Sequence, residues 1–221
     1  MFETVISQLK SAERVGIFAH ENPDGDAMGS AYSLKLALLG MGKNAEVFLS
    51  SDPDAAAYGL MRGKEASKLV LEDCDLFIAV DCAESSRLGQ YEKVFLAHPN
   101  TGAIDHHVTH RPFAKETVVQ NISSCCELMA QLYEEMRIPV TVDMANDLYL
   151  GIVTDTGNFK YSSVTPDTLR RAAALMEQGA DFSGITKIIY DTKSREYYRL
   201  MRIALERLKF YEDGRICVLY L

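Results

Sequence analysis

Short apolar runs that do not alternate with polar residues constrain the fold of this chain more than any other feature. Leu76–Val80 (LFIAV) is one such run, and Val15–Ala19 is another. A strand that is apolar at every position is buried on both faces, which is typical of a parallel sheet covered by helices. Segments with helical spacing lie between the runs. The pattern therefore predicts an α/β fold, a mostly parallel sheet with helices on both faces.

The remaining elements follow from residue spacing and from the capping and turn residues along the chain. Further strands are predicted at Ala45–Leu49, Lys93–Leu96 and Gly102–Ile104, with a short extended piece at Asn158–Ser162. Helices are predicted at Glu3–Ala12, Ala27–Met41, Cys126–Met136, Met144–Val153 and Thr165–Gln178, with a short one within residues 50–75 and one capped by Asp181. Strands and helices thus alternate along most of the chain, as the α/β class requires.

The last part of the chain has a different pattern. A charged helix is predicted over Ser194–Leu208, followed by KFYEDGRICVLYL, in which Asp213 and Gly214 form the turn of a β-hairpin. A hairpin after a long polar helix indicates a linker and the start of a second domain.

Composition argues against several classes of protein. With 23 basic and 31 acidic side chains the formal net charge is −8, which argues against a domain that grips long nucleic acid through its phosphates. A small phosphate substrate held by metal ions stays compatible with that charge.

The five cysteines form no CxxC pair, so we expect reduced thiols rather than disulfides or a zinc site. No apolar stretch approaches the roughly 18 residues of a membrane span, and the N-terminus lacks the pattern of a signal peptide, so a cytoplasmic location is expected.

Acidic and histidine side chains follow the predicted elements at the points where they end. The residues are His20, Asp24 and Asp26 after the first strand, Asp81 after LFIAV, Asp105, His106 and His107 after the strand at Gly102–Ile104, and Asp155 after the helix at Met144–Val153. In open α/β sheets, ligands bind beyond the carboxyl ends of the strands. Taken singly, each residue has a structural explanation as a turn residue, a helix cap or a surface histidine. Their joint occurrence favours one site.

Such a gathering of carboxylates indicates a metal site. Without partners they would cost several kcal/mol through like-charge repulsion and desolvation. Divalent cations would relieve that cost, and an oxygen-rich donor set with few imidazoles suits manganese or magnesium better than structural zinc.

Four sequence blocks carry a family resemblance. HENPDGDAMGS, VDCAESSRLG, IDHH and GIVTDTGNFKYSS stand in this order between His20 and Ser163. They resemble the DHH phosphoesterase family, most closely its bacterial subgroup of oligoribonucleases and 3′-phosphoadenosine-5′-phosphate (pAp) phosphatases, and the resemblance extends to about Asp181. Family II inorganic pyrophosphatases and recombination-type single-strand exonucleases are related but differ around the first aspartates.

The resemblance implies two manganese sites, with Mg²⁺ or Co²⁺ as substitutes. One ion would be held by His20, Asp24 and Asp81, and the other by Asp26, Asp81, His106 and Asp155, so that Asp81 bridges both. Two ions roughly 3.5–4 Å apart would activate a hydroxide that attacks phosphorus and would clamp a phosphoryl oxygen. Catalytic roles then fall to Asp81, to Asp105 as the partner that orients a histidine, and to His107 as a donor to the phosphate or the leaving oxygen.

Four residues are candidates for phosphate binding. Gly29 and Ser30 are expected to begin the helix after the first metal motif, where backbone amides could hold a phosphate, although close packing explains Gly29 equally well. His110 stands where the family commonly has asparagine, and it either replaces a phosphate contact or lies on the surface. Lys160 stands where arginine is frequent, and it would contact phosphate as a point charge.

The function that the resemblance implies is manganese-dependent hydrolysis of short oligoribonucleotides (nanoRNA) to mononucleotides, of pAp to AMP, or of both. The alternatives are another small-phosphate hydrolase, such as a family II-like pyrophosphatase or an enzyme for a cyclic dinucleotide product, and a non-catalytic nucleotide-binding module. Expected partners are short RNA or nucleotide substrates, with no long duplex and no membrane, and the chain could pair with a second copy as a homodimer.

The resemblance also sets an expectation for the domains. Residues 1–190 would form the catalytic metal-binding (DHH) domain, 191–208 a linker helix, and 209–221 the start of a C-terminal substrate-binding domain that is otherwise absent. We therefore expect a piece of a longer protein, which by itself binds manganese but hydrolyses its substrate weakly.

Overall fold

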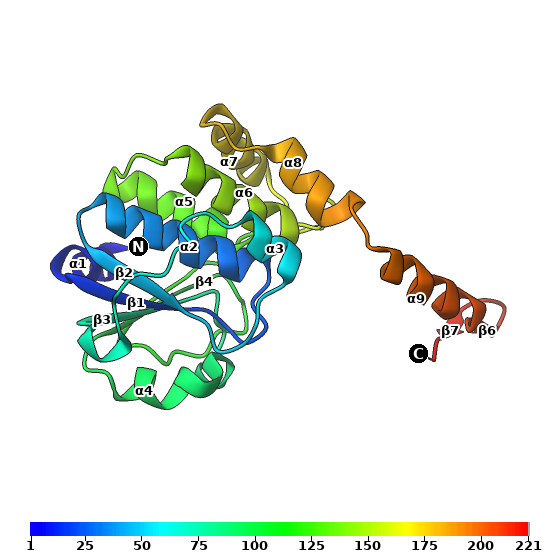
Figure 1. Ribbon diagram of the computed structural model, residues 1–221, viewed down its shortest axis with the longest axis horizontal. Coiled ribbons are helices and arrows are strands. Elements are labelled where there is room, and N and C mark those ends of the chain that lie inside the picture. Colours follow the sequence, from blue (N-terminus) through cyan, green and yellow to red (C-terminus); the bar gives the residue numbers. More distant parts are fainter. Residues whose placement is uncertain (221) are drawn as a thin grey trace. The chain divides into compact units, whose positions relative to one another are not determined.

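Residues 1–220 are described by the structure, a computed structural model, and they divide into two compact units (Figure 1). The first unit is Met1–Thr186, and the second begins at Lys187. All the predicted site residues lie in the first unit.

A five-stranded parallel sheet forms the centre of the first unit (Figure 1). Its strands are β1 (Arg14–Phe18), β2 (Asn44–Phe48), β3 (Leu76–Val80), β4 (Thr101–Asp105) and β5 (Glu116–Val119), in the order β2-β1-β3-β4-β5. Every residue of β3 and β4 is buried. The predicted α/β class with a mostly parallel sheet is confirmed, and the LFIAV run is a central strand buried on both faces.

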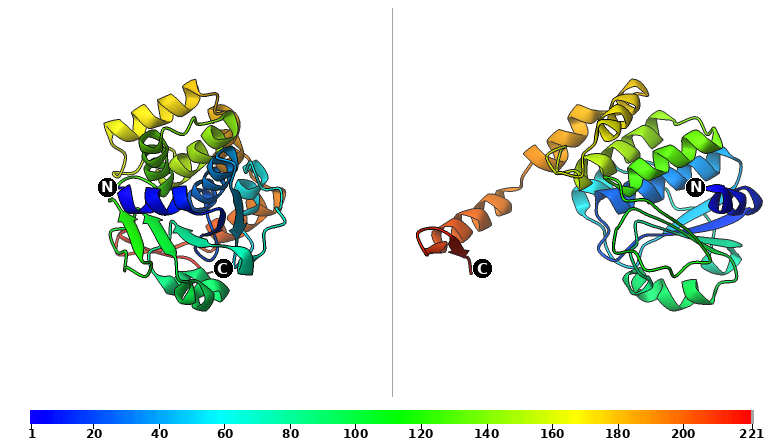
Figure 2. Two further views of the ribbon diagram at one scale, coloured as in Figure 1. Left: turned by 90° about the vertical axis from the view of Figure 1, so that its left-hand side faces the viewer. Right: turned by 180° about the vertical axis from the view of Figure 1, so that it is seen from behind.

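Helices cover both faces of this sheet, as the two views of Figure 2 show. On one face lie α1 (Glu3–Ser11), α2 (Gly25–Gly40) and α5 (Cys125–Met136), with α6 (Val142–Asp155) packed on α2 and α5. On the other face lie α4 (Glu92–Ala97) and a 3₁₀ helix at Ser85–Tyr91, where Phe95 joins an apolar cluster with Phe18 and Phe77. The shorter or outlying helices are α3 (Ala55–Leu60), α7 (Pro166–Glu177), α8 (Phe182–Thr186) and a 3₁₀ turn at Leu71–Asp73.

Three details of the predicted secondary structure are wrong. Lys93–Leu96 belongs to the helix α4 and is not a strand, because a short apolar run does not distinguish the two. Residues 158–162 form a turn and are not extended, since Asn158 and Phe159 both have left-handed backbone angles, with φ of 60° and 61°. The edge strand β5 was not predicted, because only Val118 of its residues is buried and its apolar signal is weak.

The second unit contains the predicted helix and hairpin. A π-helical turn at Lys187–Asp191 precedes α9 (Arg195–Glu206), and β6 (Lys209–Tyr211) pairs antiparallel with β7 (Ile216–Val218). Across the described part of the chain, every helix is too short or too polar to span a membrane.

Candidate metal centre

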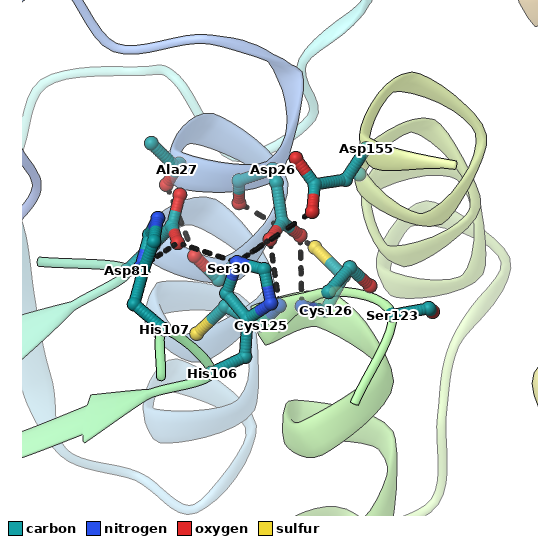
Figure 3. Close-up of polar contacts among 12 residues, drawn as sticks. Asp26, Ala27, Ser30, Asp81, His106, His107, Ser123, Cys125, Cys126 and Asp155 are labelled. Carbon is teal, nitrogen blue, oxygen red and sulfur yellow. Dashed lines mark hydrogen bonds and ion pairs between the residues drawn. The ribbon is translucent and has the colours of Figure 1, made fainter. Parts of the chain in front are cut away.

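The acidic and histidine residues predicted at the ends of elements gather at the carboxyl edge of the sheet, and Figure 3 shows Asp26, Asp81, His106, His107 and Asp155 among them. β1 leads into His20, β3 leads into Asp81, and β4 ends at Asp105 with His106 and His107 next. Because parallel strands place their carboxyl ends at one edge, residues that are far apart in the sequence meet there.

The start of α2 places its first carboxylate by helix capping. Asp24 is the N-cap: its Oδ1 accepts hydrogen bonds from the backbone N–H groups of Asp26 (3.0 Å) and Ala27 (3.1 Å). This capping begins the helix at Gly25, two residues earlier than predicted. The Asp24 side chain stays 57% exposed, and its Oδ1 lies 3.9 Å from Nε2 of His20. Asp24 can therefore serve as a cap and still face the centre.

Asp26 is fully buried and is bound by the start of α5 (Figure 3). Its two carboxylate oxygens accept hydrogen bonds from the backbone N–H groups of Cys125 (2.6 Å) and Cys126 (2.8 Å). The positive end of a helix dipole favours a negative charge there. Burial in the first place, and then the carboxylates of Asp81 and Asp155, nevertheless raise the pKa of Asp26 well above its usual value. A cation beside Asp26 would stabilise its ionised form.

Glycines let α2 and α6 approach closely, and this brings the carboxylates of the two helices together. A Cβ on Gly29 would lie 2.3 Å from the carbonyl oxygen of Asp147 in α6. A Cβ on Gly151 in α6 would lie 2.7 Å from Oδ1 of Asp26. Larger residues at these positions would push the helices apart. The distance between the first metal motif and the carboxylate that ends α6 thus depends on small residues.

Asp81 has a strained backbone conformation, and its carboxylate lies between the side chains of His20 and His106. It follows β3 directly with φ of 52°, which is uncommon for a residue other than glycine. The Nε2 atoms of His106 and His20 lie 3.4 and 3.6 Å from its two carboxylate oxygens. Burial alone would raise the pKa of Asp81, but the two imidazoles outweigh burial and lower that pKa below its usual value. Its Oδ1 is buried without a hydrogen-bond partner among the described residues.

His106 faces three carboxylates at once. Its Nε2 lies 3.4 Å from Asp81 Oδ1, 3.5 Å from Asp155 Oδ2 and 3.8 Å from Asp26 Oδ2. The carbonyl oxygen of Ile122 lies 3.1 Å from Nδ1 and can accept the Nδ1–H, which leaves Nε2 directed at the acids. Burial lowers the pKa of His106, but the carboxylates outweigh it and raise that pKa to about 10. The pKa of Asp155 is raised to about 6, first by burial and despite His106.

The donor atoms of this edge fit divalent cations. The residues form three groups, and within each group the possible ligand atoms lie within 4.8 Å of one another. The groups are His20, Asp24 and Asp81; Asp26, His106 and Asp155; and Asp81, His106 and His107. Most of the donors are carboxylate oxygens and a minority are imidazole nitrogens, the set that suits Mn²⁺ or Mg²⁺. A cation would also satisfy the unpartnered Oδ1 of Asp81. All six residues predicted as ligands therefore belong to these groups, and the group of Asp81, His106 and His107 links the other two because it contains one member of each.

Asp105 is fully buried and binds two histidines. Its Oδ1 lies 2.7 Å from Nδ1 of His107, and its Oδ2 lies 2.6 Å from Nδ1 of His110. Burial would raise the pKa of Asp105, but these two hydrogen bonds outweigh burial and lower it. The hydrogen bond to Asp105 in turn raises the pKa of His107. Asp105 thus orients His107 from behind and is not a member of the three donor groups.

The structure corrects the expectation for two of the phosphate-binding candidates. Because α2 begins at Gly25, Gly29 and Ser30 lie inside the helix, where both are buried and their amides fall beyond the unpaired N–H groups of its first turn. The packing explanation of Gly29 accounts for its position. His110 is not a surface residue, since its side chain is only 4% exposed. Lys160 lies exposed in the turn after α6.

Two contacts of the site were not predicted. A helix is predicted at Cys126–Met136, one residue short of the observed start of α5, but nothing in the local sequence indicates that the N–H groups of Cys125 and Cys126 bind Asp26. Arg87, within the SSRLG segment, places a guanidinium nitrogen 3.2 Å from Nδ1 of His20. Both contacts join residues more than 60 positions apart, and local spacing carries no signal for them.

Comparison with known families identifies the region that carries these motifs. Residues 14–152 match the family described as "DHH family, N-terminal domain". The matched segment includes every predicted site residue except Asp155 and Lys160.

Individual relatives match almost the whole chain. The bifunctional oligoribonuclease and PAP phosphatase NrnA of Thermus thermophilus is 32% identical over 98% of this chain and 66% of its own length. The protein of the same name from Bacillus subtilis is 26% identical over 97% of this chain and 68% of its own length. Among solved structures, an exopolyphosphatase-related protein from Bacteroides fragilis has a TM-score of 0.90 at 25% identity, covering 100% of this chain and 68% of that one. The chain thus spans about two thirds of the length of these relatives.

Proposed function

The chain belongs to the DHH family, and on this premise we propose that it is a phosphoesterase that hydrolyses short oligoribonucleotides, pAp or both, with two Mn²⁺ ions in the centre described above. One observation carries the proposal: two of the three donor groups share the buried carboxylate of Asp81, and His106 of the remaining group places its Nε2 3.4 Å from Asp81 Oδ1. A site for a single structural ion would not need a carboxylate shared in this way. The substrate class comes from the relatives of Thermus thermophilus and Bacillus subtilis, which are named bifunctional oligoribonuclease and PAP phosphatase.

The residues of the centre divide between two ions in this proposal. One ion would be held by His20, Asp24 and Asp81, and the other by Asp26, Asp81, His106 and Asp155. When bound, such a pair supplies Lewis acidity that acidifies water and offsets the charge of phosphoryl oxygens.

His107 is the protein group best placed to contact the substrate. Its side chain is 33% exposed, whereas the side chains of His20 and His106 are 7% and 12% exposed. The hydrogen bond between its Nδ1 and Asp105 raises the pKa of His107, and the protonated ring can donate from Nε2 to a phosphoryl oxygen or give a proton to the leaving oxygen. Lys160, five positions after Asp155, would add positive charge for the phosphate.

The proposal is tested by comparing three substrates on the Mn²⁺-loaded chain: pAp, a pentaribonucleotide and pyrophosphate. We expect AMP and phosphate from pAp, or mononucleotides from the pentamer, faster than phosphate from pyrophosphate. Faster release from pyrophosphate would overturn the substrate assignment. Because turnover by this chain is expected to be slow, calorimetry should also show Mn²⁺ binding at micromolar concentrations, and no binding there would contradict the metal centre.

Two matched variants assign the activity to this site. Asp155→Asn removes a charge from the centre and should abolish hydrolysis together with tight binding of one ion. Asp167→Asn removes a charge of the same type from α7, where the side chain is 75% exposed, and should leave both unchanged.

A further inference from the structure

We infer that His110 is a positioning residue that fixes the orientation of His107 through Asp105. The inference rests on the proposed function, in which His107 contacts the substrate. The three side chains are joined in series, since the two carboxylate oxygens of Asp105 lie 2.7 Å from Nδ1 of His107 and 2.6 Å from Nδ1 of His110.

A tight turn places His110 against the carboxylate of Asp105. The backbone N–H of His110 donates to the carbonyl oxygen of His107 at 3.1 Å, so the chain reverses directly after the metal motif. Oδ1 of Asp105 accepts from His107 and also from the backbone N–H of His106 at 2.9 Å. Oδ2 accepts from His110. Each oxygen of this fully buried carboxylate thus has its own donor.

The surroundings of His110 decide which proton its ring carries. Its side chain is 4% exposed, and its ring lies against that of Phe113, with centroids 5.7 Å apart. Its Nε2 is buried and has no hydrogen-bond partner among the described residues. A proton on Nε2 would be a buried donor without an acceptor, so the proton resides on Nδ1 and is donated to Asp105. Phe113 limits rotation of the ring, which makes His110 a fixed donor rather than a mobile one.

Loss of the His110 donor should disturb the orientation of His107 without altering the metal ligands. Oδ2 of Asp105 would be left buried and unpaired, and the carboxylate could rotate to seek another partner. Rotation would release the ring of His107 from its single orientation. Partners that orient a metal-ligating histidine from behind typically contribute about 10–100-fold to activity or affinity, and we expect an effect of the same order for the histidine that contacts the substrate.

The kinetic test uses two replacements of His110 and one neighbouring control in the Mn²⁺-loaded chain. His110→Leu removes the donor but keeps much of the volume, and should lower kcat about 10–100-fold while KM and Mn²⁺ affinity stay within a few-fold of the unmodified chain. His110→Asn places an amide N–H near the position of Nδ1 and should restore most of kcat. Val108→Ala, at a side chain in the same turn that is 75% exposed, should leave kcat unchanged. An undiminished kcat in His110→Leu, or equal losses in the Leu and Asn variants, would overturn the inference.

A second readout does not depend on turnover. Long-range ¹H–¹⁵N NMR of the ring nitrogens, recorded at alkaline pH where the rings are neutral, should show protonated Nδ1 in both His107 and His110 of the unmodified chain, and a mixture of His107 tautomers in His110→Leu. A proton on Nε2 alone in His110 would overturn the inference even if His110→Leu failed to fold. If no substrate is hydrolysed but these spectra are as expected, the proposed function fails and the positioning contact stands.

Discussion

Replacing Gly29 with alanine should destabilise this protein, whereas the same replacement at Gly40 in the same helix should stabilise it. A Cβ on Gly29 would lie 2.3 Å from the carbonyl oxygen of Asp147 and 2.9 Å from Sγ of Cys126. A Cβ on Gly40 would meet no atom within 4 Å. The pair therefore separates the contact between α2 and α6 from the helix propensity of alanine.

The two substitutions should change the free energy of unfolding in opposite directions. Both gain helix propensity, but only Gly29→Ala adds a steric clash. Alanine gains roughly 0.5–1 kcal/mol over glycine within a helix, and Gly40→Ala should keep that gain, which raises Tm by about 1–4 °C. At Gly29 the nearest atom belongs to a backbone carbonyl that cannot rotate away, so α6 has to shift. Overpacking of this kind typically costs about 1–3 kcal/mol. After subtraction of the helix-propensity gain, we expect a net loss of about 1–2 kcal/mol for Gly29→Ala, or roughly 2–8 °C in Tm.

The assay is urea and thermal denaturation of both variants without metal, followed by Mn²⁺ titration. Because a shift of α6 would separate Asp26 from Asp155, Gly29→Ala should also weaken Mn²⁺ binding, and Gly40→Ala should not. If Gly29→Ala were as stable as the unmodified chain, α2 and α6 would not be in close contact at this point, and the packing explanation of Gly29 would be wrong.

Three further outcomes concern the metal centre. Asp81→Asn keeps a residue type that tolerates positive φ, so the fold should persist while calorimetry shows Mn²⁺ affinity reduced by at least about 100-fold; unchanged affinity would remove Asp81 from the centre. Because the pKa of His106 is raised to about 10 without metal, its ring is protonated near neutral pH and Mn²⁺ has to displace that proton. Affinity should therefore rise from about pH 6 to 8, with protons released that calorimetry detects in buffers of different ionisation enthalpy; binding without proton release would contradict this charge state. Mn²⁺ at 100 times its Kd should add about 2.7 kcal/mol to the free energy of unfolding, and EDTA should reverse the gain, so an unfolding midpoint insensitive to both would argue against a folded-state site.

The fold could be predicted wherever burial of a segment produces a recognisable apolar pattern in its sequence. The central strand Leu76–Val80 is apolar at all five positions because helices cover both faces of the sheet. The edge strand β5 buries only Val118, and its sequence gives little sign of a strand. Lys93–Leu96 is equally compatible with strand and helix, and its packing beneath the sheet decided for helix.

The membership of the candidate site could be predicted because its residues stand at the ends of elements. The proximity of Asp81 to His106 follows from two parallel strands ending at one edge. The place of Gly29 and Ser30 could not be predicted, because it depended on where the Asp24 cap begins the helix. His110 could not be placed either, since its environment depends on how the turn after the metal motif packs.

By itself, the sequence determined the alternation of buried strands and helices and the set of acidic and histidine residues at the carboxyl edge of the sheet. Only the tertiary structure decided that the N–H groups of Cys125 and Cys126 bind Asp26 from 99 and 100 positions away, and that Asp105 is shared between His107 and His110. The physical reason is that local patterns report burial and turns, whereas the partner of a buried carboxylate depends on which helix end or turn packs beside it.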